Sequence, residues 1–283
     1  MRSHRGARRS GRSLPACILP ALAILLLCVV EHTAQPSRHL MDPRPSVVNP
    51  LPFGPGERAE YQVRLGALSV GSGAMEILNV QQVNGNPSFH ARMRISGGLP
   101  LARVNDVFES WIDVGGIFSR RFKQDQHELT FRRNRTYDFF PEQRTYRREN
   151  GETGSIPTSR PLDDVSFLYF VRTLPLRVGD VYEVPRYFKE DGNPVIIRVL
   201  RTETVRVPAG TFETVVVQPI IRTDGLFGEG GQAEVFFTND ARRLLVQMRS
   251  RVPLIGSLTL HLRSYRAGEP YAAGGAATRG PAR

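Results

Sequence analysis

Short segments of alternating apolar and polar residues dominate the chain from residue 57 to residue 266. In residues 89–95, the clearest case, the odd-numbered residues are apolar and the even-numbered ones are basic. Successive side chains of a β-strand point to opposite faces of the sheet, so one face of this segment meets a core and the other meets water. Residues 258–263 and 61–65 repeat the pattern. Amphipathic β-strands are therefore predicted for most of this region.

Residue pairs typical of tight turns separate these segments. Asn84-Gly85, Asn150-Gly151 and Asp191-Gly192 can adopt the positive φ angles of two-residue hairpin turns. Pro208-Ala209-Gly210 places a proline at the entry of a turn and a glycine two positions later. Turns this short join antiparallel neighbours, whereas parallel strands need longer crossovers. An antiparallel sheet is therefore predicted.

One apolar segment lacks the alternation and is predicted to be a short helix. Pro161 and Pro175 bracket the segment, and Asp163 stands where a helix N-cap is expected. Acids at its start and Arg172 near its end suit the helix dipole. A helix that is apolar nearly all round must be buried. The predicted fold is therefore mainly β: a curved antiparallel sheet or open barrel with one short helix packed on its concave side.

The first 34 residues have the pattern of a secretory leader. Five arginines precede the uncharged apolar residues 14–30, and a short polar stretch ends at Ala34. The apolar run is also long enough to span a bilayer. Residues 1–34 are therefore predicted to be a cleaved signal peptide or a retained signal anchor. We expect an exported protein that is periplasmic or associated with the envelope, and anchored in the inner membrane if the leader is not cleaved.

The remaining chain divides by composition. Residues 35–56 are rich in proline and are predicted to be an extended linker. Residues 57–266 are predicted to be a single β domain, and the Gly/Ala-rich residues 267–283 a disordered tail. Both cysteines, Cys17 and Cys28, lie in the leader. Cleavage would therefore leave a protein without a disulfide, a thiolate metal site or a cysteine nucleophile.

The charge of the chain is strongly basic, with a formal net charge of +11. The most basic part is residues 120–148, where Arg132, Arg133 and Arg135 lie among aromatic residues. This stretch is either the solvated face of two or three strands or a docking surface for lipid phosphates or acidic polysaccharide. A nucleic-acid partner is not expected for an exported protein without a recognition motif.

The motifs of common enzyme classes are incomplete in this sequence. His127-Glu128 lacks the second histidine of the zinc peptidase motif. The glycines near Ser69 and Ser72 do not form a nucleophile elbow. The glycine-rich residues 225–231 lack the lysine and the helix of a phosphate loop. We therefore assign no catalytic residue, metal ligand or cofactor, and enzymatic activity is not the favoured expectation.

Two further features are candidate contacts for a ligand or partner. Trp111, the single tryptophan, lies between Glu109 and Asp113 on one strand face, where it either stacks on a sugar or packs against protein. The two acids are roughly 13 Å apart by strand rise, which is too far for a glycosidase pair. Leu226 and Phe227 lie within a glycine-rich loop and can contact lipid or a partner if they are exposed.

Several short motifs, taken in order, resemble an exported bacterial family known as domain of unknown function 3108. They comprise Pro52 to Glu57 with Tyr61 and Val63, Ser69-Val70-Gly71, Asp163 to Ser166 with Leu168, Tyr169 and Arg172, Val207 to Phe212, and Phe237-Thr238 with Asp240 and Arg242-Arg243-Leu244. The resemblance runs from about Phe53 to Tyr265. It implies an exported all-β domain with a curved antiparallel sheet, and it carries over no catalytic residue.

Three functional hypotheses follow. The favoured one is a non-enzymatic envelope protein that holds an apolar or amphipathic, lipid-like ligand, or a protein partner, in the hollow of its sheet. The second is a structural or interaction module with a solid core, and the third is a hydrolase of envelope glycans. The oligomeric state is left unassigned. The candidate contact residues are Trp111, Arg132, Arg133, Arg135, Leu226 and Phe227.

Overall fold

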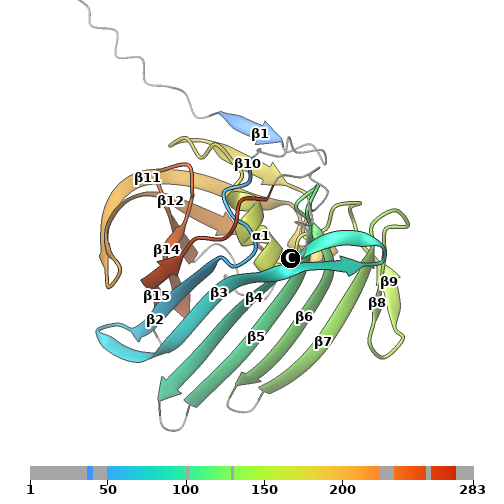
Figure 1. Cartoon of the computed structure of the whole chain (residues 1–283), viewed down its shortest axis with the longest axis horizontal. Coiled ribbons are helices and arrows are strands. Elements are labelled where there is room, and N and C mark those ends of the chain that lie inside the picture. Colours follow the sequence, from blue (N-terminus) through green and yellow to red (C-terminus); the bar gives the residue numbers. More distant parts are fainter. Residues whose placement is uncertain are drawn as a thin grey trace, which may run out of the picture. The chain divides into compact units, whose positions relative to one another are not determined.

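The computed structural model describes residues 37–40, 50–99, 102–128, 131–222, 233–252 and 256–271. This part of the chain contains one α-helix, one short 3-10 helix and fifteen strands (Figure 1). The helices are α1 (Asp164–Val171) and η1 (Glu190–Gly192). The strands are β1 (Arg38–Leu40), β2 (Arg58–Leu65), β3 (Leu68–Val83), β4 (Asn86–Leu99), β5 (Ala102–Asp113), β6 (Ser119–Glu128), β7 (Phe131–Phe140), β8 (Thr145–Arg148), β9 (Thr153–Ser155), β10 (Val181–Val184), β11 (Val195–Val207), β12 (Gly210–Ile220), β13 (Ala233–Thr238), β14 (Leu245–Val252) and β15 (Gly256–Arg266).

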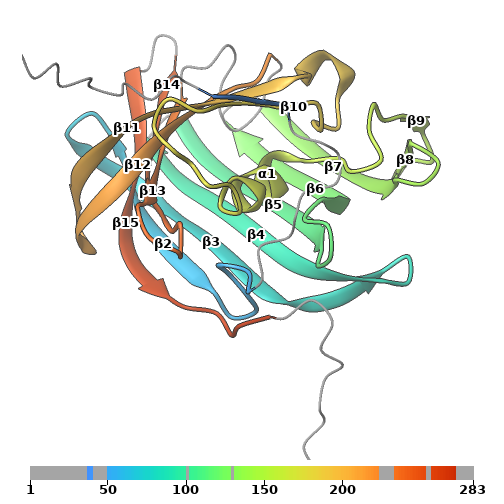
Figure 2. The same ribbon diagram turned by 90° about the horizontal axis from the view of Figure 1, so that it is seen from above.

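The strands form one continuous sheet in the order β1-β10-β11-β12-β13-β14-β15-β2-β3-β4-β5-β6-β7-β8-β9. Neighbouring strands are antiparallel, except that β1 pairs with β10 in parallel. The two ends of this order, β1 and β9, are not paired with each other in the described part of the chain. The sheet is therefore curved and open (Figure 2), and the predicted fold class is confirmed.

Breaks in strand register accompany the curvature. Six of the strand pairs contain a bulge or shift, for example between Trp111 and Ile112 in β5 and between Ile77 and Asn79 in β3. An extra residue on one strand bends it and increases its twist, which allows a long sheet to wrap round. The predicted turn at Asn84-Gly85 joins β3 to β4 with φ angles of 49° and 77°. Asp191-Gly192, by contrast, belongs to η1 and not to a two-residue hairpin turn.

Helix α1 begins at its predicted cap. The Asp163 carboxylate accepts hydrogen bonds of 2.8 Å from the backbone N–H groups of Val165 and Ser166. In return, the Ser166 hydroxyl accepts a hydrogen bond from the backbone N–H of Asp163, which completes a capping box. All eight residues of the helix are buried, as predicted from its composition.

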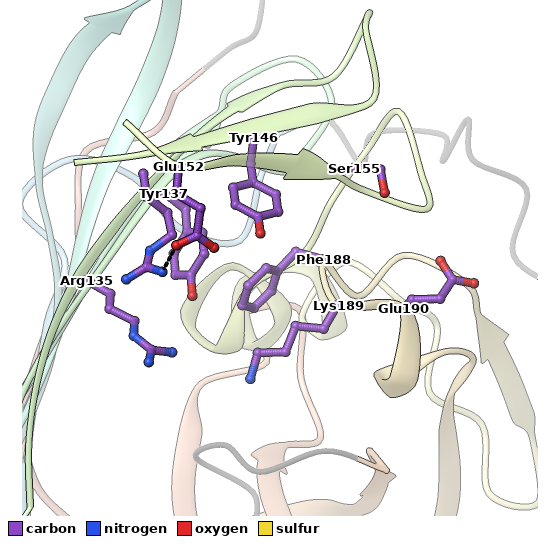
Figure 3. A pocket seen from close by; sticks show the side chains of 9 residues that line it. Arg135, Tyr137, Tyr146, Glu152, Ser155, Phe188, Lys189 and Glu190 are labelled. Atoms are coloured by element: carbon purple, nitrogen blue, oxygen red, sulfur yellow. Dashed lines mark hydrogen bonds and ion pairs between the residues drawn. The ribbon is translucent and has the colours of Figure 1, made fainter. Parts of the chain in front are cut away.

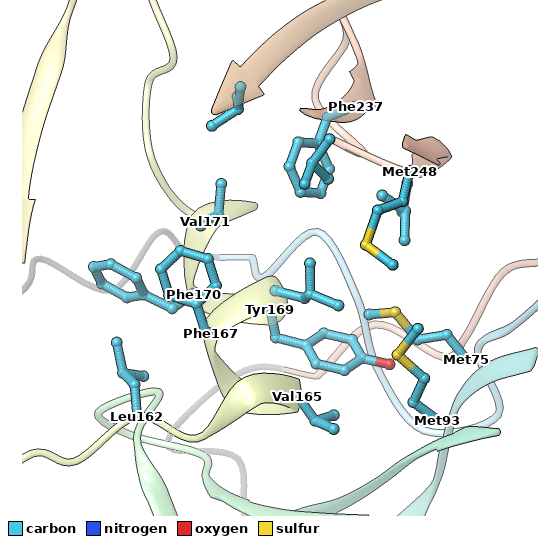
Figure 4. Close-up of a cluster of buried hydrophobic side chains, with 14 of the residues drawn as sticks. Met75, Met93, Leu162, Val165, Phe167, Tyr169, Phe170, Val171, Phe237 and Met248 are labelled. Carbon is cyan, nitrogen blue, oxygen red and sulfur yellow. The ribbon is translucent and has the colours of Figure 1, made fainter. Parts of the chain in front are cut away.

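The side chains of α1 fill the concave side of the sheet around the helix. Figure 4 shows Tyr169 directed toward Met75 and Met93, with Phe237 and Met248 on another side of the helix. These side chains belong to a single cluster of buried residues that includes strands from both halves of the sheet. The hollow around the helix is therefore filled by protein side chains.

A buried ion pair joins α1 to the start of β2. The Arg172 guanidinium donates to both carboxylate oxygens of Glu57, over 2.6 and 2.9 Å, and their side chains are 1% and 4% exposed. The same guanidinium donates to the backbone oxygens of Pro52 and Arg242. The pair thus connects the helix, β2 and the turn after β13.

The segments on either side of the strand region pack against the core where they are described. Leu51 and Phe53, from the proline-rich stretch, are 6% and 4% exposed, and the Phe53 ring meets Tyr169 edge-on at 4.9 Å. Tyr271 meets Phe89 at 5.0 Å. The last residues of the expected linker and the first of the expected tail therefore contribute to the fold, because their apolar side chains reach the open edge of the core.

Burial raises the pKa of Asp163 to about 6. The loss of hydration is the largest cause, and the hydrogen bond from the Ser110 hydroxyl (2.6 Å) offsets it only in part. The adjacent Asp164 adds like-charge repulsion. The N-cap of α1 therefore carries an acid whose charged form is disfavoured by the fold.

Replacing Asp163 with asparagine is expected to remove a pH dependence of stability. The pKa of Asp163 is higher in the folded state than its ordinary 3.8. The stabilisation from the protonated acid is therefore complete below about pH 4 and is lost as the pH rises through about 6. As the pH rises from about 4 to about 6, the free energy of unfolding of the wild type should fall by up to roughly 3 kcal/mol relative to that of Asp163→Asn. In this variant the amide still caps the helix. Urea unfolding at several pH values tests this, and parallel stability curves for the two proteins would contradict it.

Candidate functional site

Strand β7 divides the predicted arginine patch between the two faces of the sheet. Tyr137 and Phe139 are buried on the concave face. Alternation along the strand places Arg133 and Arg135 on that same face and the exposed Arg132 on the outer face. The three arginines therefore do not form one docking surface, because consecutive side chains of a strand point in opposite directions.

A half-open cavity of about 470 Å³ lies between β7, the β8–β9 hairpin and the segment that follows β10 (Figure 3). This volume is within the range of small-molecule sites. One of the predicted contact residues, Arg135, lines the cavity, which we call the β7 pocket. The lining residues are Arg135, Tyr137, Tyr146, Arg148, Glu152, Ser155, Phe188, Lys189 and Glu190.

Aromatic rings form one wall of the β7 pocket. Tyr137 meets Tyr146 edge-on at 5.4 Å and Phe188 at 5.3 Å, and Phe139 supports Phe188 from behind at 5.7 Å. The hydroxyl groups of Tyr137 and Tyr146 have no hydrogen-bond partner within the described residues. The wall therefore offers both apolar ring surface and two hydroxyl groups to a ligand.

Two cations of the β7 pocket form no ion pair within the described residues, although the charge of Arg135 helps to lower the pKa of Glu149, an acid outside the pocket lining. Figure 3 shows Arg135 near Tyr137 and Lys189 near Phe188, with both side chains extending below the rings in this view. Within the described chain neither Arg135 nor Lys189 forms an ion pair, whereas Arg148 is paired with Glu152. The Lys189 ammonium lies 5.6 Å from the Phe188 ring centroid. The pocket therefore combines an aromatic wall with positive charge that its own acids do not neutralise.

The β8–β9 hairpin holds Tyr146 in place. Gly151 adopts a φ of +85° at the turn, and Asn150 accepts a hydrogen bond from the backbone N–H of Glu152. Gly154 lies directly beneath the Tyr146 ring, and a Cβ atom there would lie 2.6 Å from ring atoms. Any larger residue at position 154 would push the tyrosine out of its place in the pocket wall.

The segment that carries Phe188 and Lys189 is fixed by buried polar groups. Arg186 is 1% exposed and donates to the backbone oxygens of Arg160 and Ile117, and burial lowers its pKa to about 9. The Asn193 side chain accepts from the backbone N–H of Tyr187 and donates to the backbone oxygens of Tyr187 and Lys189. These hydrogen bonds fix the backbone of the segment that carries Phe188 and Lys189.

Trp111 lies on the outer face, away from the β7 pocket. Its ring stacks on His90 at 4.3 Å with an interplanar angle of 8°, and its indole N–H donates to Gln81 over 2.8 Å. The Arg121 guanidinium lies 5.5 Å from the indole ring. His90 is an even-numbered residue of the segment 89–95, whose polar face was predicted to meet water; that prediction is wrong for His90, since its side chain is only 12% exposed. Protein groups thus surround the tryptophan that sequence alone made a sugar-stacking candidate.

The two acids beside Trp111 are each held by cationic or imidazole groups. Glu109 lies 3.1 Å from the His90 ring nitrogen, and this hydrogen bond lowers the pKa of Glu109. Asp113 accepts from Arg120 over 2.8 Å. A raised pKa, which a glycosidase general acid needs, is therefore not found at Glu109. The geometry gives no support to the glycan hydrolase hypothesis at this face.

Leu226 and Phe227 lie outside the described residues. Among the residues that are described, no group of three His, Cys, Asp or Glu side chains could hold a metal ion, and no helix has the length and apolar character of a membrane span.

Fold and pocket together define an open-barrel β protein with a small, cationic and aromatic pocket at one side of its sheet. The model of a family described as "Protein of unknown function (DUF3108)" matches residues 60–263. The chain therefore belongs to this family, and the resemblance seen in the sequence is confirmed. No protein of curated function matches the chain.

Solved structures of several uncharacterised bacterial proteins are similar to the chain. A β-barrel-like protein of domain of unknown function DUF1849 from Brucella abortus has a TM-score of 0.48 and 10% identity over 79% of this chain and 100% of that one. The hypothetical protein CT021 from Chlamydia trachomatis has a TM-score of 0.36 and 11% identity over 79% and 93%. A Bacteroides fragilis protein with a YmcC-like fold, described as exported, has a TM-score of 0.28 and 12% identity over 77% and 98%. No function is transferred from these likenesses.

Proposed function

We propose that the protein is an exported, non-enzymatic binding protein of the cell envelope, and that its ligand site is the β7 pocket. The observation that carries the proposal is the aromatic wall of Tyr137, Tyr146 and Phe188 beside two cations, Arg135 and Lys189, that form no ion pair within the described residues. The basic and apolar leader supports export. The proposed site is not the hollow of the sheet that the sequence favours, because α1 occupies that hollow. The β7 pocket is smaller than such a hollow would be.

The chemistry of the pocket selects an amphipathic anion. Ring surface favours a flat or apolar body, which gains from leaving water. Arg135 and Lys189 favour a carboxylate, sulfonate or phosphate group, since a charged acceptor forms the stronger hydrogen bonds. A cavity of about 470 Å³ accommodates a headgroup or a small ring system. The proposed ligand class is therefore a small molecule with an acidic group on an apolar body.

A second candidate function is an interaction module without a small ligand. The observation in its favour is the filled concave side, where α1 packs against both halves of the sheet. The two candidates differ in one result: an interaction module binds no amphipathic anion in the β7 pocket.

Binding of 2-naphthoate and of its neutral analogue 2-naphthol, measured by isothermal titration calorimetry, tests the proposal. We expect the acid to bind more tightly than the alcohol. Arg135→Gln and Lys189→Gln should each weaken acid binding by about fivefold, or about 1 kcal/mol, because each removes one partly solvated ionic contact. The affinity for the alcohol should change by less than about twofold.

Arg132→Gln is the matched control, since Arg132 lies on the same strand and projects from the outer face. This variant should bind the acid as the wild type does. Equal losses in the Arg132 and Arg135 variants, or equal affinities of the wild type for acid and alcohol, would remove the basis for the proposed site.

A further inference from the structure

One acid that lines the β7 pocket is already hydrogen-bonded to one of the pocket's cations. Glu152, in the turn of the β8–β9 hairpin, accepts a hydrogen bond from Nη1 of Arg148, and both residues line the pocket. We infer that Glu152 is a built-in competitor: its carboxylate takes the position at Arg148 that the acidic group of the ligand occupies in the complex. This inference rests on the proposed function and adds a third specificity-determining cation to it.

The setting of Arg148 fits an anion-binding role. Its guanidinium lies 5.9 Å from the centroid of Tyr137, so it faces the aromatic wall. Its side chain is 17% exposed. Its Nε atom is buried and has no hydrogen-bond partner within the described residues. The buried Nε is out of a ligand's reach, but Glu152 accepts from only one terminal nitrogen of Arg148, Nη1, so a ligand with several acceptor oxygens can use the terminal donors of this guanidinium.

Glu152 is held loosely compared with the arginine that it contacts. Its side chain is 48% exposed. Ion pairs with a partner this exposed contribute about 0–1 kcal/mol, because water and salt screen them. The competitor therefore costs little to displace.

The hairpin does not depend on the side-chain pair. Backbone hydrogen bonds close it instead, from Arg148 N–H to the Glu152 carbonyl (2.7 Å) and from Gly151 N–H to the Arg148 carbonyl (3.0 Å). Asn150 also accepts from the Glu152 N–H over 3.0 Å. The Glu152 carboxylate can therefore turn away from Arg148 while the hairpin stays folded.

The exchange makes the pocket selective. An acidic ligand that reaches Arg148 together with Arg135 and Lys189 replaces one exposed ion pair by contacts to three cations. A neutral ligand of the same shape has no negative charge to replace the Glu152 carboxylate at Arg148, so the ion pair between Glu152 and Arg148 stays intact. Glu152 thereby lowers the affinity for acids below the value that the three cations alone would give.

Glu190 provides a matched control for Glu152. It also lines the pocket, but within the described residues its carboxylate forms neither an ion pair nor a hydrogen bond. Removing either glutamate changes the charge of the pocket by the same amount. Any difference between the two variants therefore reports the specific contact with Arg148.

The experiment is calorimetric titration of 2-naphthoate into the wild type, Glu152→Ala and Glu190→Ala. We expect Glu152→Ala to tighten acid binding by up to about fivefold, which corresponds to about 1 kcal/mol, and Glu190→Ala by less than about twofold, while binding of 2-naphthol is unchanged in both. In an Arg148→Gln background, Glu152→Ala should have no more effect than Glu190→Ala, because the contested cation is gone. Glu152→Gln, which keeps the size of the side chain, should give an intermediate gain.

The outcomes separate the two proposals. Equal gains in Glu152→Ala and Glu190→Ala, or a gain for Glu152→Ala that persists in the Arg148→Gln background, would overturn the competitor while leaving the binding site intact. An absence of acid binding by every variant, with thermal unfolding unchanged, would instead contradict the proposed function itself.

Discussion

Replacing Glu57 with glutamine is expected to destabilise the protein by about 3–5 kcal/mol, because the change leaves the Arg172 guanidinium buried without a counter-charge. In the wild type this pair is almost wholly removed from water, at 4% and 1% exposure. Burial alone would lower the pKa of Arg172, but Glu57 raises it above its ordinary value. Equilibrium unfolding in urea measures the loss. An exposed pair such as Arg242 with Asp240 supplies the control, and Asp240→Asn should cost less than about 1 kcal/mol.

The double variant Glu57→Leu/Arg172→Met separates charge from packing. Replacing a buried ion pair by apolar side chains of similar size is often neutral or stabilising, since neither charge then has to leave water. We expect the double variant to recover most of the stability that Glu57→Gln loses. A double variant less stable than the single one would show that the hydrogen bonds to Pro52 and Arg242, and not the unpaired charge, dominate.

Shortening Phe170 to alanine is expected to cost about 3–5 kcal/mol, because it opens a cavity at the centre of the packed concave side. The Phe170 ring is 0% exposed. It also carries the guanidinium of Arg186 at 4.6 Å from its centroid, and that contact is lost with the ring. Urea unfolding measures the effect, and Val178→Ala, at a side chain 54% exposed, should change stability by less than about 0.5 kcal/mol.

The Phe170→Ala result also bears on what fills the sheet. A loss below about 1 kcal/mol would mean that the space round α1 is loosely packed and open to a ligand, as the sequence-based hypothesis of a binding hollow supposes. A loss in the expected range would place the ligand outside that space and leave the β7 pocket as the site to test.

The sequence predicted α1 well because its signals are local. Pro161, Asp163 and the all-round apolar surface lie within a dozen residues of one another. A capping box depends on residues three positions apart, so tertiary structure is not needed to recognise it. The antiparallel sheet could be predicted for the same reason, because the turn residues Asn84-Gly85 directly connect the two strands that they pair.

The β7 pocket could not be predicted, because it is assembled over long sequence distances. Phe188 and Lys189 reach Tyr137 only after the chain has passed through β8, β9 and α1. The basic, aromatic stretch pointed to Arg135, but without the strand assignment of residues 131–140 it grouped that residue with Arg132, which lies on the opposite face. Lys189 is one of only two lysines in the chain, a rarity that signals nothing until its neighbours are known.

Cross-strand register also decides the environment of Trp111. His90 and Trp111 are direct partners across β4 and β5, which brings their rings into a stack. The sequence placed each side chain on a polar face but could not show that the two faces coincide. A histidine expected in water and a tryptophan considered for sugar binding therefore cover each other.

We propose that the β7 pocket binds an amphipathic anion through Arg135 and Lys189. The decisive experiment is a crystal structure of the protein with 2-naphthoate. We expect the naphthalene rings to pack against Tyr137, Tyr146 and Phe188, the carboxylate to contact both cations, and Glu152 to turn away from Arg148. Naphthoate bound elsewhere, such as against Trp111 on the outer face, with none in the β7 pocket, would rule this site out.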